Sequence, residues 1–511
     1  MSRAPRSSAD SAGKTARWHP LALVPLVLTA WVYYPITGVF FFADDFYHLG
    51  RITNESPLLW LIAPFGGHNL ILRNLAFLSS WELFGFHSEP WYWTVLFTHL
   101  LNVWLLFDVL SALTASTLLA CFGATLWGIC PLDAGTIGWY AVYGQVMVAT
   151  ILLVVLDRVV RLAATGERLP TRTACLWYVL LLLGTTCFGI GIGVALVFPV
   201  ILFLLLPAAW RQPGVRIAYL ALPAVTLALY FGLRTLSGWI QPLSFSENMH
   251  LIAAKDGLRD IPWMLLPLIG FAVGGAGLGH AFDPRTFVDA RTCVVIAALV
   301  LGLGLVAWRG DWKTRRTMIA MAALAVGIYG VVAAGRAHMY IVFHYPLAQA
   351  ATEPRYHYVG TIPIVILICQ VLQQVGRVGW LSALPRGPLL AVGLALQVGA
   401  YLLSGFHIDQ HPATREYVTR TFKEMHDAVS ASPAGTTVSI ENDETQLVLG
   451  PMLRTFLPGR AGLFLFLSPD DTLDGRHVRF VERDPDILAI WAARPGSRLA
   501  TLLVAPSPAG E

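Results

Sequence analysis

Unbroken apolar runs of helical length constrain the fold of this chain more than any other feature. Clear examples are 21–42, 91–112 and 191–208. Each run has about twenty residues, which is the length that a helix needs to cross the hydrocarbon core of a bilayer. Backbone groups in lipid must be paired within one helix or around a closed barrel, and barrel strands are shorter and alternate in polarity. The sequence therefore predicts an α-helical polytopic membrane protein.

The composition supports this class, because hydrophobic residues make up 56% of the chain and charged residues only 13%. Mean hydropathy is +0.62, far above the range of soluble domains. The formal net charge is +4, with basic residues spread between the apolar runs, which argues against a nucleic-acid partner. All six cysteines lie in or beside apolar runs without the spacing of zinc ligands, so we expect small core residues rather than disulfides or a metal site.

The distribution of lysine and arginine predicts how the chain threads the membrane, because basic short loops stay in the cytoplasm. Four basic segments are expected on that side, namely the tail 1–20 and the loops 157–173, 209–216 and 309–316. The first apolar run ends in bulky aromatic residues without a small-residue cleavage site, so we expect an uncleaved signal anchor. Segment 43–90 is acidic instead, and it is expected to be an external loop.

About eleven spans satisfy both the length rule and the charge rule. They are expected near 21–42, 91–112, 114–131, 136–156, 174–188, 191–208, 217–234, 292–308, 317–334, 358–375 and 388–404. Segment 261–279 is also apolar, but a crossing there would move the basic loop 309–316 outside, so we expect a re-entrant or external-side helix. The transmembrane domain is thus expected to cover 21–404, with a second external loop at 335–357.

The segment 405–511 is more polar and is expected to form a small soluble α/β domain on the external side. An amphipathic helix is expected around 418–429, because apolar residues recur there at helical spacing. Short β-rich runs follow at 436–441, 462–467, 478–482 and 499–504.

Two adjacent carboxylates, Asp44 and Asp45, follow directly after the first span. If a helix begins at Asp44, then His48 and Arg51 lie on the same face at i+4 and i+7. A partly desolvated carboxylate at the membrane surface is suited to accept a proton from a hydroxyl group or to bind a cation. The same pair could instead only cap a helix at the water boundary, and the spacing alone leaves both interpretations open.

Further candidate binding residues occupy both external loops and the second span. They are His68, Arg73, His99, Glu353, Arg355, Tyr356 and His357. Arg355 could hold a phosphate through charge-assisted hydrogen bonds, although an arginine in an ordinary interfacial aromatic belt is the alternative. His99 with Asn102 is either a substrate contact or an interhelical hydrogen-bonded pair.

These residues together resemble the integral-membrane glycosyltransferases of the GT-C type, which include protein O-mannosyltransferases and transferases that modify lipid A and polysaccharides. The similar positions are the Asp44-Asp45 pair, Arg73 ahead of Phe84-Gly85, Pro90, His99, Asn102, Pro131 followed by Trp139, and Arg355-Tyr356. Cys130 and Asp133 depart from the pattern, since many relatives have histidines there.

The resemblance implies a GT-C-like bundle that moves a sugar from a polyprenyl-phosphate donor to a glycan, lipid or protein acceptor, with inversion at the sugar carbon. Asp44 would be the general base, Asp45 would assist it or bind an ion, and Arg355 would hold the carrier phosphate. His344 or His357 would help to stabilise the departing phosphate. No cofactor is expected to be obligatory, and a divalent cation at the carboxylate pair is compatible with the pattern. The expected location is a bacterial inner membrane, with the site facing the periplasm or exterior.

Two other functions stay open from the residues alone. A flippase or other transporter of lipid-linked sugars would also have many spans, but the sequence has no inverted repeat and few ionisable residues within its spans. A polysaccharide polymerase or ligase would use a similar donor, but its main site would lie in a large late external loop. The C-terminal segment could serve a transferase as an acceptor-binding module.

Overall fold

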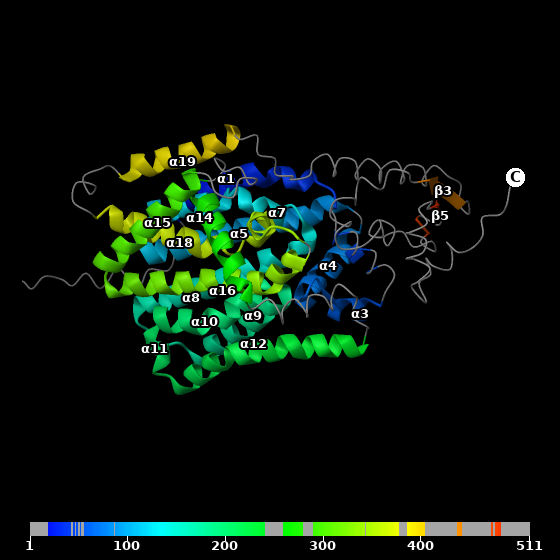
Figure 1. The fold of residues 1–511 in the computed structure, drawn as a ribbon, viewed down its shortest axis with the longest axis horizontal. Helices are drawn as coiled ribbons and strands as arrows, with labels where there is room; N and C mark the ends of the chain where they lie inside the picture. The colour runs from blue at the N-terminus through cyan, green and yellow to red at the C-terminus, as the bar shows by residue number, and fades with distance from the viewer. Residues whose placement is uncertain are drawn as a thin grey trace, which may run out of the picture.

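A computed structural model of the chain shows a mostly helical protein with a continuous apolar core (Figure 1). It describes residues 19–41, 44–45, 48–49, 52, 56–85, 87–240, 259–278, 290–342, 344–377, 386–403, 437–441, 472–473 and 476–481.

The longer helices follow the apolar runs of the sequence. They are α1 Leu23–Tyr33, α4 Ile71–Phe84, α5 Ser88–Thr114, α6 Thr117–Gly128, α8 Gly144–Thr165, α9 Thr171–Cys187, α10 Ile190–Leu205, α12 Pro213–Ile240, α14 Ile261–Leu278, α15 Ala290–Arg309, α16 Trp312–Val342, α18 Thr361–Val375 and α19 Arg386–Leu403. The short elements are η2 Pro20–Ala22, η3 Tyr34–Gly38, α3 Pro57–Ile62, η4 Pro131–Asp133, α7 Ala134–Ile137, η5 Tyr140–Val142, α11 Pro207–Trp210, α17 Leu347–Ala350 and η8 Pro354–Tyr356.

Several of these helices have the length and apolar composition needed to cross a membrane. The four that do so by themselves are Pro20–Gly38, Ser88–Thr114, Pro213–Ile240 and Trp312–Ile341. A fifth candidate is α6 with η4 and α7, which are bent by 44° at the break between them. The described part of the chain is therefore that of a helical membrane protein. A helix lies in each of the eleven predicted ranges, but the number of crossings stays a prediction.

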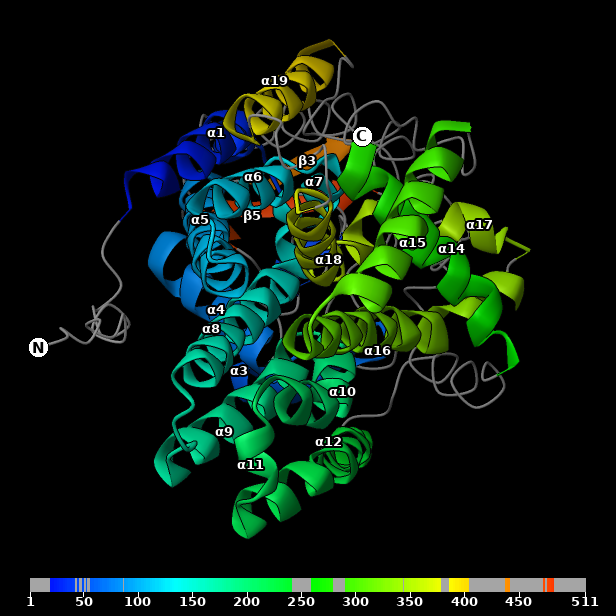
Figure 2. The same cartoon turned by 90° about the vertical axis from the view of Figure 1, so that its left-hand side faces the viewer.

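The bundle is built around α16, which packs against α10, α14 and α18 (Figure 2). Glycines permit the closest of these approaches, because a Cβ on Gly193 of α10 would lie 2.4 Å from the carbonyl oxygen of Gly327 in α16. Small residues bring membrane helices close enough for extensive van der Waals contact. The segment predicted to be re-entrant forms α14, which packs against α15, α16 and α18, and its re-entrant path stays a prediction.

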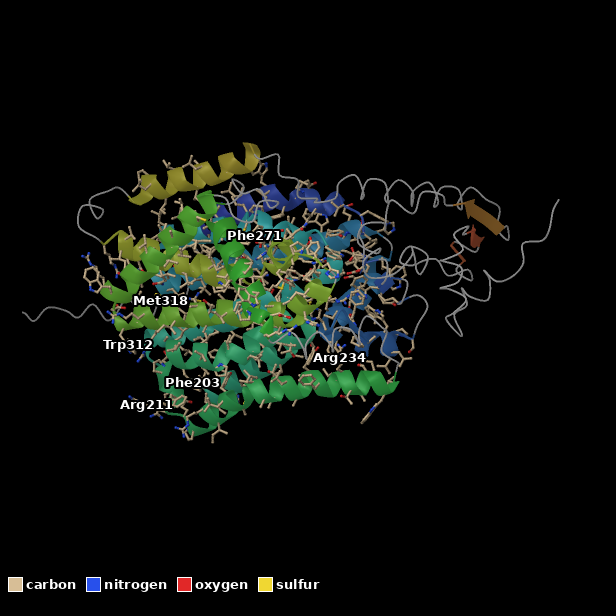
Figure 3. All side chains as sticks on the ribbon, viewed as in Figure 1. Phe203, Arg211, Arg234, Phe271, Trp312 and Met318 are labelled. Carbon is tan, nitrogen blue, oxygen red and sulfur yellow. The ribbon has the colours of Figure 1, made fainter. Side chains whose placement is uncertain are left out.

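The two ends of the bundle differ in the residues that they carry. Helices α3 and α4 lie at one end (Figure 1). Arg211 and Trp312, which belong to the loops predicted to be cytoplasmic, lie at the opposite end from Arg234 and from α3 (Figure 3). These two residues of the basic loops thus lie at a different end of the bundle from α3, and the side of the membrane that each end faces stays a prediction.

Three short strands are described in the C-terminal segment. β3 Thr437–Glu441 pairs in parallel with β5 Arg476–Val481, and β4 Thr472–Leu473 pairs antiparallel with β5. β3 and β5 coincide with two of the predicted β-rich runs. The predicted strands at 462–467 and 499–504, and the predicted helix at 418–429, lie outside the described residues. The assignment of 405–511 as an α/β domain stays a prediction.

Candidate functional site

Asp44 is half-buried and lies among arginines from three separate parts of the chain. Arg355 comes from η8, Arg73 from α4 and Arg336 from α16, and each interacts electrostatically with the Asp44 carboxylate. Burial raises the pKa of Asp44 above its ordinary value, and the positive charges of the three arginines oppose that rise. The structure thus brings Asp44 and Arg355 together although they are far apart in sequence.

Arg73 reaches this cluster from the first turn of α4, and its side chain is fully buried. Its guanidinium carbon lies 5.7 Å from the centroid of the Phe77 ring, one turn further along the helix. Gly144 at the start of α8 leaves room for Arg73, because a Cβ there would lie 3.1 Å from Arg73 Cγ and 2.0 Å from the Cys187 carbonyl oxygen. The side chain of Arg73 is therefore held in position by the close approach of α8.

Arg336 is the member of the cluster that the sequence did not predict. Its Nη2 donates to the Gly66 carbonyl oxygen at 3.2 Å and lies 3.4 Å from Nε2 of His68. Gly66 and Gly67 have φ angles of +59° and +83°, which glycine adopts easily, and they form the turn between β1 Pro64–Phe65 and β2 His68–Asn69. Arg336 therefore ties the hairpin that carries His68 to α16. Arg336 was not selected as a site residue from the sequence, because the predicted span ended at 334 and Arg336 lies just after it.

Arg355 lies between two aromatic rings, with its guanidinium carbon 5.4 Å from the centroids of both Trp139 and Tyr356. Glu353 pairs with it at 3.8 Å, and 21% of the Arg355 side chain stays exposed. The exposed part of Arg355 is thus available to an anion that enters beside Asp44.

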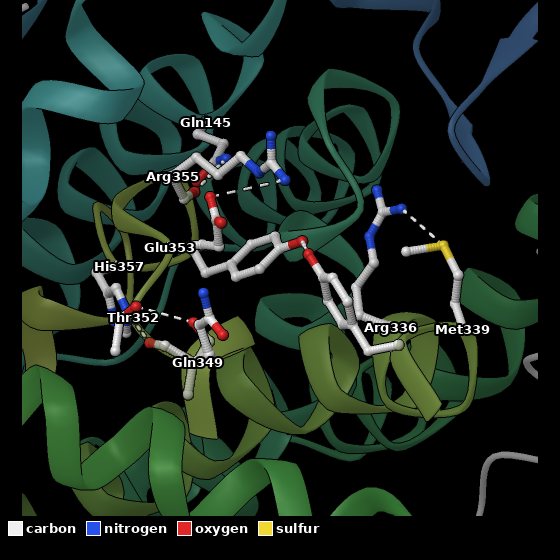
Figure 4. Close-up of polar contacts among 11 residues, drawn as sticks. Gln145, Arg336, Met339, Gln349, Thr352, Glu353, Arg355 and His357 are labelled. Atoms are coloured by element: carbon white, nitrogen blue, oxygen red, sulfur yellow. Dashed lines mark hydrogen bonds and ion pairs between the residues drawn. The ribbon is translucent and has the colours of Figure 1, made fainter. Parts of the chain in front are cut away.

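Two further contacts fix the backbone around Arg355. Gln145 at the start of α8 donates from Nε2 to the Arg355 carbonyl oxygen at 2.7 Å (Figure 4). The hydroxyl groups of Tyr356 and Tyr340 are 2.6 Å apart and join η8 to α16. Both tyrosines are buried, so η8 is held on one side by α8 and on the other by α16, which carries Arg336.

Asp45 has a different environment from Asp44, because its side chain is fully buried. Its Oδ1 accepts from the backbone N–H of Ala141 at 2.6 Å, and its Oδ2 accepts from the hydroxyl of Tyr92 at 3.5 Å. These bonds tie the segment after the first span to η5 and α5. The carboxylate pair is therefore divided between a half-buried group that faces arginines and a buried group that holds the backbone.

The histidines predicted to bind substrate mostly lie in the interior. His48 is buried, and its ring centroid lies 4.6 Å from that of Phe65. His99 is fully buried, with Nδ1 2.8 Å from the Tyr358 hydroxyl and Nε2 3.1 Å from the Gly128 carbonyl oxygen. These bonds correspond to the interhelical alternative that the sequence left open.

His357 is likewise buried, with Nδ1 3.1 Å from the Tyr329 hydroxyl and Nε2 2.8 Å from the Ala351 carbonyl oxygen. Burial lowers the pKa of His357 to about 4, and the hydrogen bond to Ala351 opposes this change. A neutral imidazole with both nitrogens occupied is suited to orient η8. Arg51, which was predicted to bind substrate, lies outside the described residues. His344 is exposed in the loop before α17.

Within the described part of the chain, no three or more histidine, cysteine or acidic side chains are grouped so that they could hold a metal ion. The divalent cation at Asp44 and Asp45 stays a prediction. Asp44 and the three arginines can bind an anionic group and accept a proton beside it.

Searches of family models, curated proteins and solved structures found no match to the chain.

Proposed function

We propose that the protein is a membrane glycosyltransferase of the GT-C type, which moves a sugar from a polyprenyl-phosphate donor to a glycan, lipid or protein acceptor with inversion. The observation that carries this proposal is the half-buried Asp44 carboxylate among Arg73, Arg336 and Arg355. Such a group supplies the two elements that transfer needs, a proton acceptor and positive charge for a phosphate that departs.

The proposal includes a membrane topology finer than the helices alone establish. About eleven spans would cross a bacterial inner membrane, and loops 43–90 and 335–357 would face the periplasm or exterior with the C-terminal α/β domain. The cluster then opens on the side where an acceptor arrives from water. The polyprenyl chain of the donor would lie in the bilayer beside the bundle.

In the proposed mechanism, Arg355 and Arg336 bind the carrier phosphate from two sides, while buried Arg73 adds positive charge behind them. The three arginines stabilise the negative charge that grows on the phosphate as the sugar leaves. Asp44 accepts the proton of the acceptor hydroxyl as that oxygen attacks the sugar carbon from the opposite face. Asp45 positions this segment through Ala141, because its carboxylate accepts a backbone hydrogen bond there.

The test is donor turnover by the purified full chain in nanodiscs. The chain is incubated with a panel of polyprenyl-phosphate sugars and short acceptors, and released polyprenyl phosphate and glycosylated acceptor are measured by mass spectrometry. Formation of both products in equal amounts is the expected result. Asp108→Asn is the matched control, because Asp108 is an acidic residue paired with Arg161, outside the arginine cluster.

Movement of intact donor between leaflets without product would support a flippase and contradict the transferase. Product formation that is unchanged in the Asp44→Asn and Asp45→Asn variants would contradict the assignment of this site. Turnover restricted to diphosphate-linked oligosaccharides would favour a polymerase or ligase instead.

A further inference from the structure

The turn η4, directly after the break that follows α6, ends in a buried carboxylate that the proposed mechanism does not use. Asp133 is fully buried at the end of η4. Within the described part of the chain, neither of its carboxylate oxygens has a hydrogen-bond partner. An ionised carboxylate buried without a partner is costly, because it loses the solvation that water provides. A carboxylate in this place is stable either as the protonated acid or with a bound cation beside it.

Two tyrosines near Asp133 cannot donate a hydrogen bond to it, because their hydroxyl protons are used elsewhere. Tyr329 of α16 and Tyr358, which precedes α18, lie within electrostatic range of it. In a neutral imidazole, the nitrogen opposite the N–H is an acceptor. His99 donates from Nε2 to Gly128, and His357 donates from Nε2 to Ala351, so both Nδ1 atoms must accept.

Both phenol protons are consequently directed to histidines. Tyr358 donates to His99 at 2.8 Å, and Tyr329 donates to His357 at 3.1 Å. A phenol has only one proton, so each hydroxyl offers the Asp133 side only oxygen lone pairs. Asn102 uses one lone pair of Tyr358, to which it donates at 3.2 Å. These two tyrosines thus offer Asp133 acceptors and no donor, and the Cys130 thiol within electrostatic range of it is only a weak donor.

Thr136 adds another oxygen to this region. It lies three residues after Asp133, on the same face of the helical turn, and it is also fully buried. Its hydroxyl has no hydrogen-bond partner within the described residues. Helix α14 closes over the break, because a Cβ on Gly275 would lie 2.4 Å from Leu132 Cδ1. The oxygens are therefore shielded from bulk water by α14.

We propose that the break between α6 and η4 binds a dehydrated monovalent cation, with sodium as the ligand to test, through Asp133 and Thr136. In many secondary transporters, sodium binds where a membrane helix is interrupted and backbone carbonyl oxygens replace part of its hydration shell. A single carboxylate balances one positive charge, whereas a divalent ion would leave an uncompensated charge in an apolar interior. The bound cation stabilises η4 and α7 in the positions where η8 packs on them, and η8 carries Arg355. This inference does not depend on the proposed transfer reaction.

The test uses the full chain in nanodiscs at fixed pH and ionic strength, with ²²Na⁺ binding and thermal unfolding as readouts. Saturable ²²Na⁺ binding is expected, displaced by unlabelled sodium and not by choline or magnesium. Replacing choline by sodium should raise the unfolding temperature by a few degrees, since a ligand of the native state stabilises it. Asp133→Asn should lose both responses, and Thr136→Val should weaken sodium binding about 10-fold.

Asp108→Asn serves as the control, because Asp108 is half-buried but paired with Arg161 at 3.3 Å. It should keep both sodium responses. If Asp133→Asn does not fold, wild type and Thr136→Val still decide the proposal. Absence of saturable sodium binding by wild type, undiminished binding by Asp133→Asn, or displacement by magnesium but not by sodium would each overturn it.

Discussion

Replacing Arg355 by lysine separates the charge of this residue from its shape. Lysine keeps the positive charge but loses the planar group that lies 5.4 Å from the rings of Trp139 and Tyr356. A cation–π contact at a partly exposed site contributes about 0.5–1 kcal/mol, so two such contacts amount to about 1–2 kcal/mol. If the rings orient Arg355 toward the donor phosphate, Arg355→Lys should weaken donor binding about 5- to 30-fold.

Arg355→Ala removes the charge as well and should have a larger effect. A hydrogen bond to a charged group contributes about 1.5–3 kcal/mol, which corresponds to about 10- to 150-fold in affinity. The pair with Glu353 adds little, because both side chains are partly exposed and the two atoms are 3.8 Å apart. The expected order of donor affinity is therefore wild type, then lysine, then alanine.

A fluorescent short-chain polyprenyl phosphate in nanodiscs would measure these affinities, with protein abundance and melting temperature recorded for each variant. Arg309→Lys is the matched control, because its guanidinium carbon lies 4.8 Å from the Trp308 ring in a loop predicted to be cytoplasmic. Donor affinity should not change in that control. Equal affinity in wild type and Arg355→Lys would refute the role of the two rings, and equal affinity in Arg355→Ala would refute the phosphate contact itself.

Three other expectations concern neighbouring parts of the structure. Arg336→Met removes a positive charge that lowers the pKa of Asp44, so the pKa should rise and the acid limb of the pH–rate profile should move to higher pH. An unchanged limb would exclude Asp44 as the titrating base. Gly144→Ala should lower the melting temperature, since overpacking at 2.0 Å from a backbone oxygen costs about 1–3 kcal/mol, whereas Gly214→Ala has open space and should change little. Truncation after residue 405 should leave donor binding intact, and its complete loss in a stable, inserted truncation would place part of the site in the C-terminal segment.

The positions of the helices could be predicted because hydrophobicity is the physical reason that they form in lipid. Their ends were less predictable where polar residues continue a helix. The predicted span 317–334 corresponds to α16 Trp312–Val342, which continues through Arg336 because helical hydrogen bonding does not stop where the side chains become polar. The predicted span 136–156 corresponds to α8 Gly144–Thr165, because residues before Gly144 form short separate turns instead.

The candidate site was predictable only in part, because tertiary contacts decide what each polar residue does. Adjacent Asp44 and Asp45 look equivalent in the sequence, yet Asp45 is held by the N–H of Ala141. His99 has a sequence signal that is also compatible with a substrate contact, but its two ring nitrogens bond to other parts of the bundle. Arg336 had no local signal, since its approach to Gly66 depends on how α16 packs against a distant hairpin.

The most direct test of the central claim is a comparison of turnover and donor affinity for Asp44→Asn in one membrane preparation. Asparagine keeps the size of the side chain but removes the charge and the ability to accept a proton. Sugar transfer should be nearly abolished, while the Kd for a polyprenyl-phosphate donor stays within about threefold of wild type, because the arginines that bind the phosphate are unchanged. Full sugar transfer by a correctly inserted Asp44→Asn variant would contradict the account.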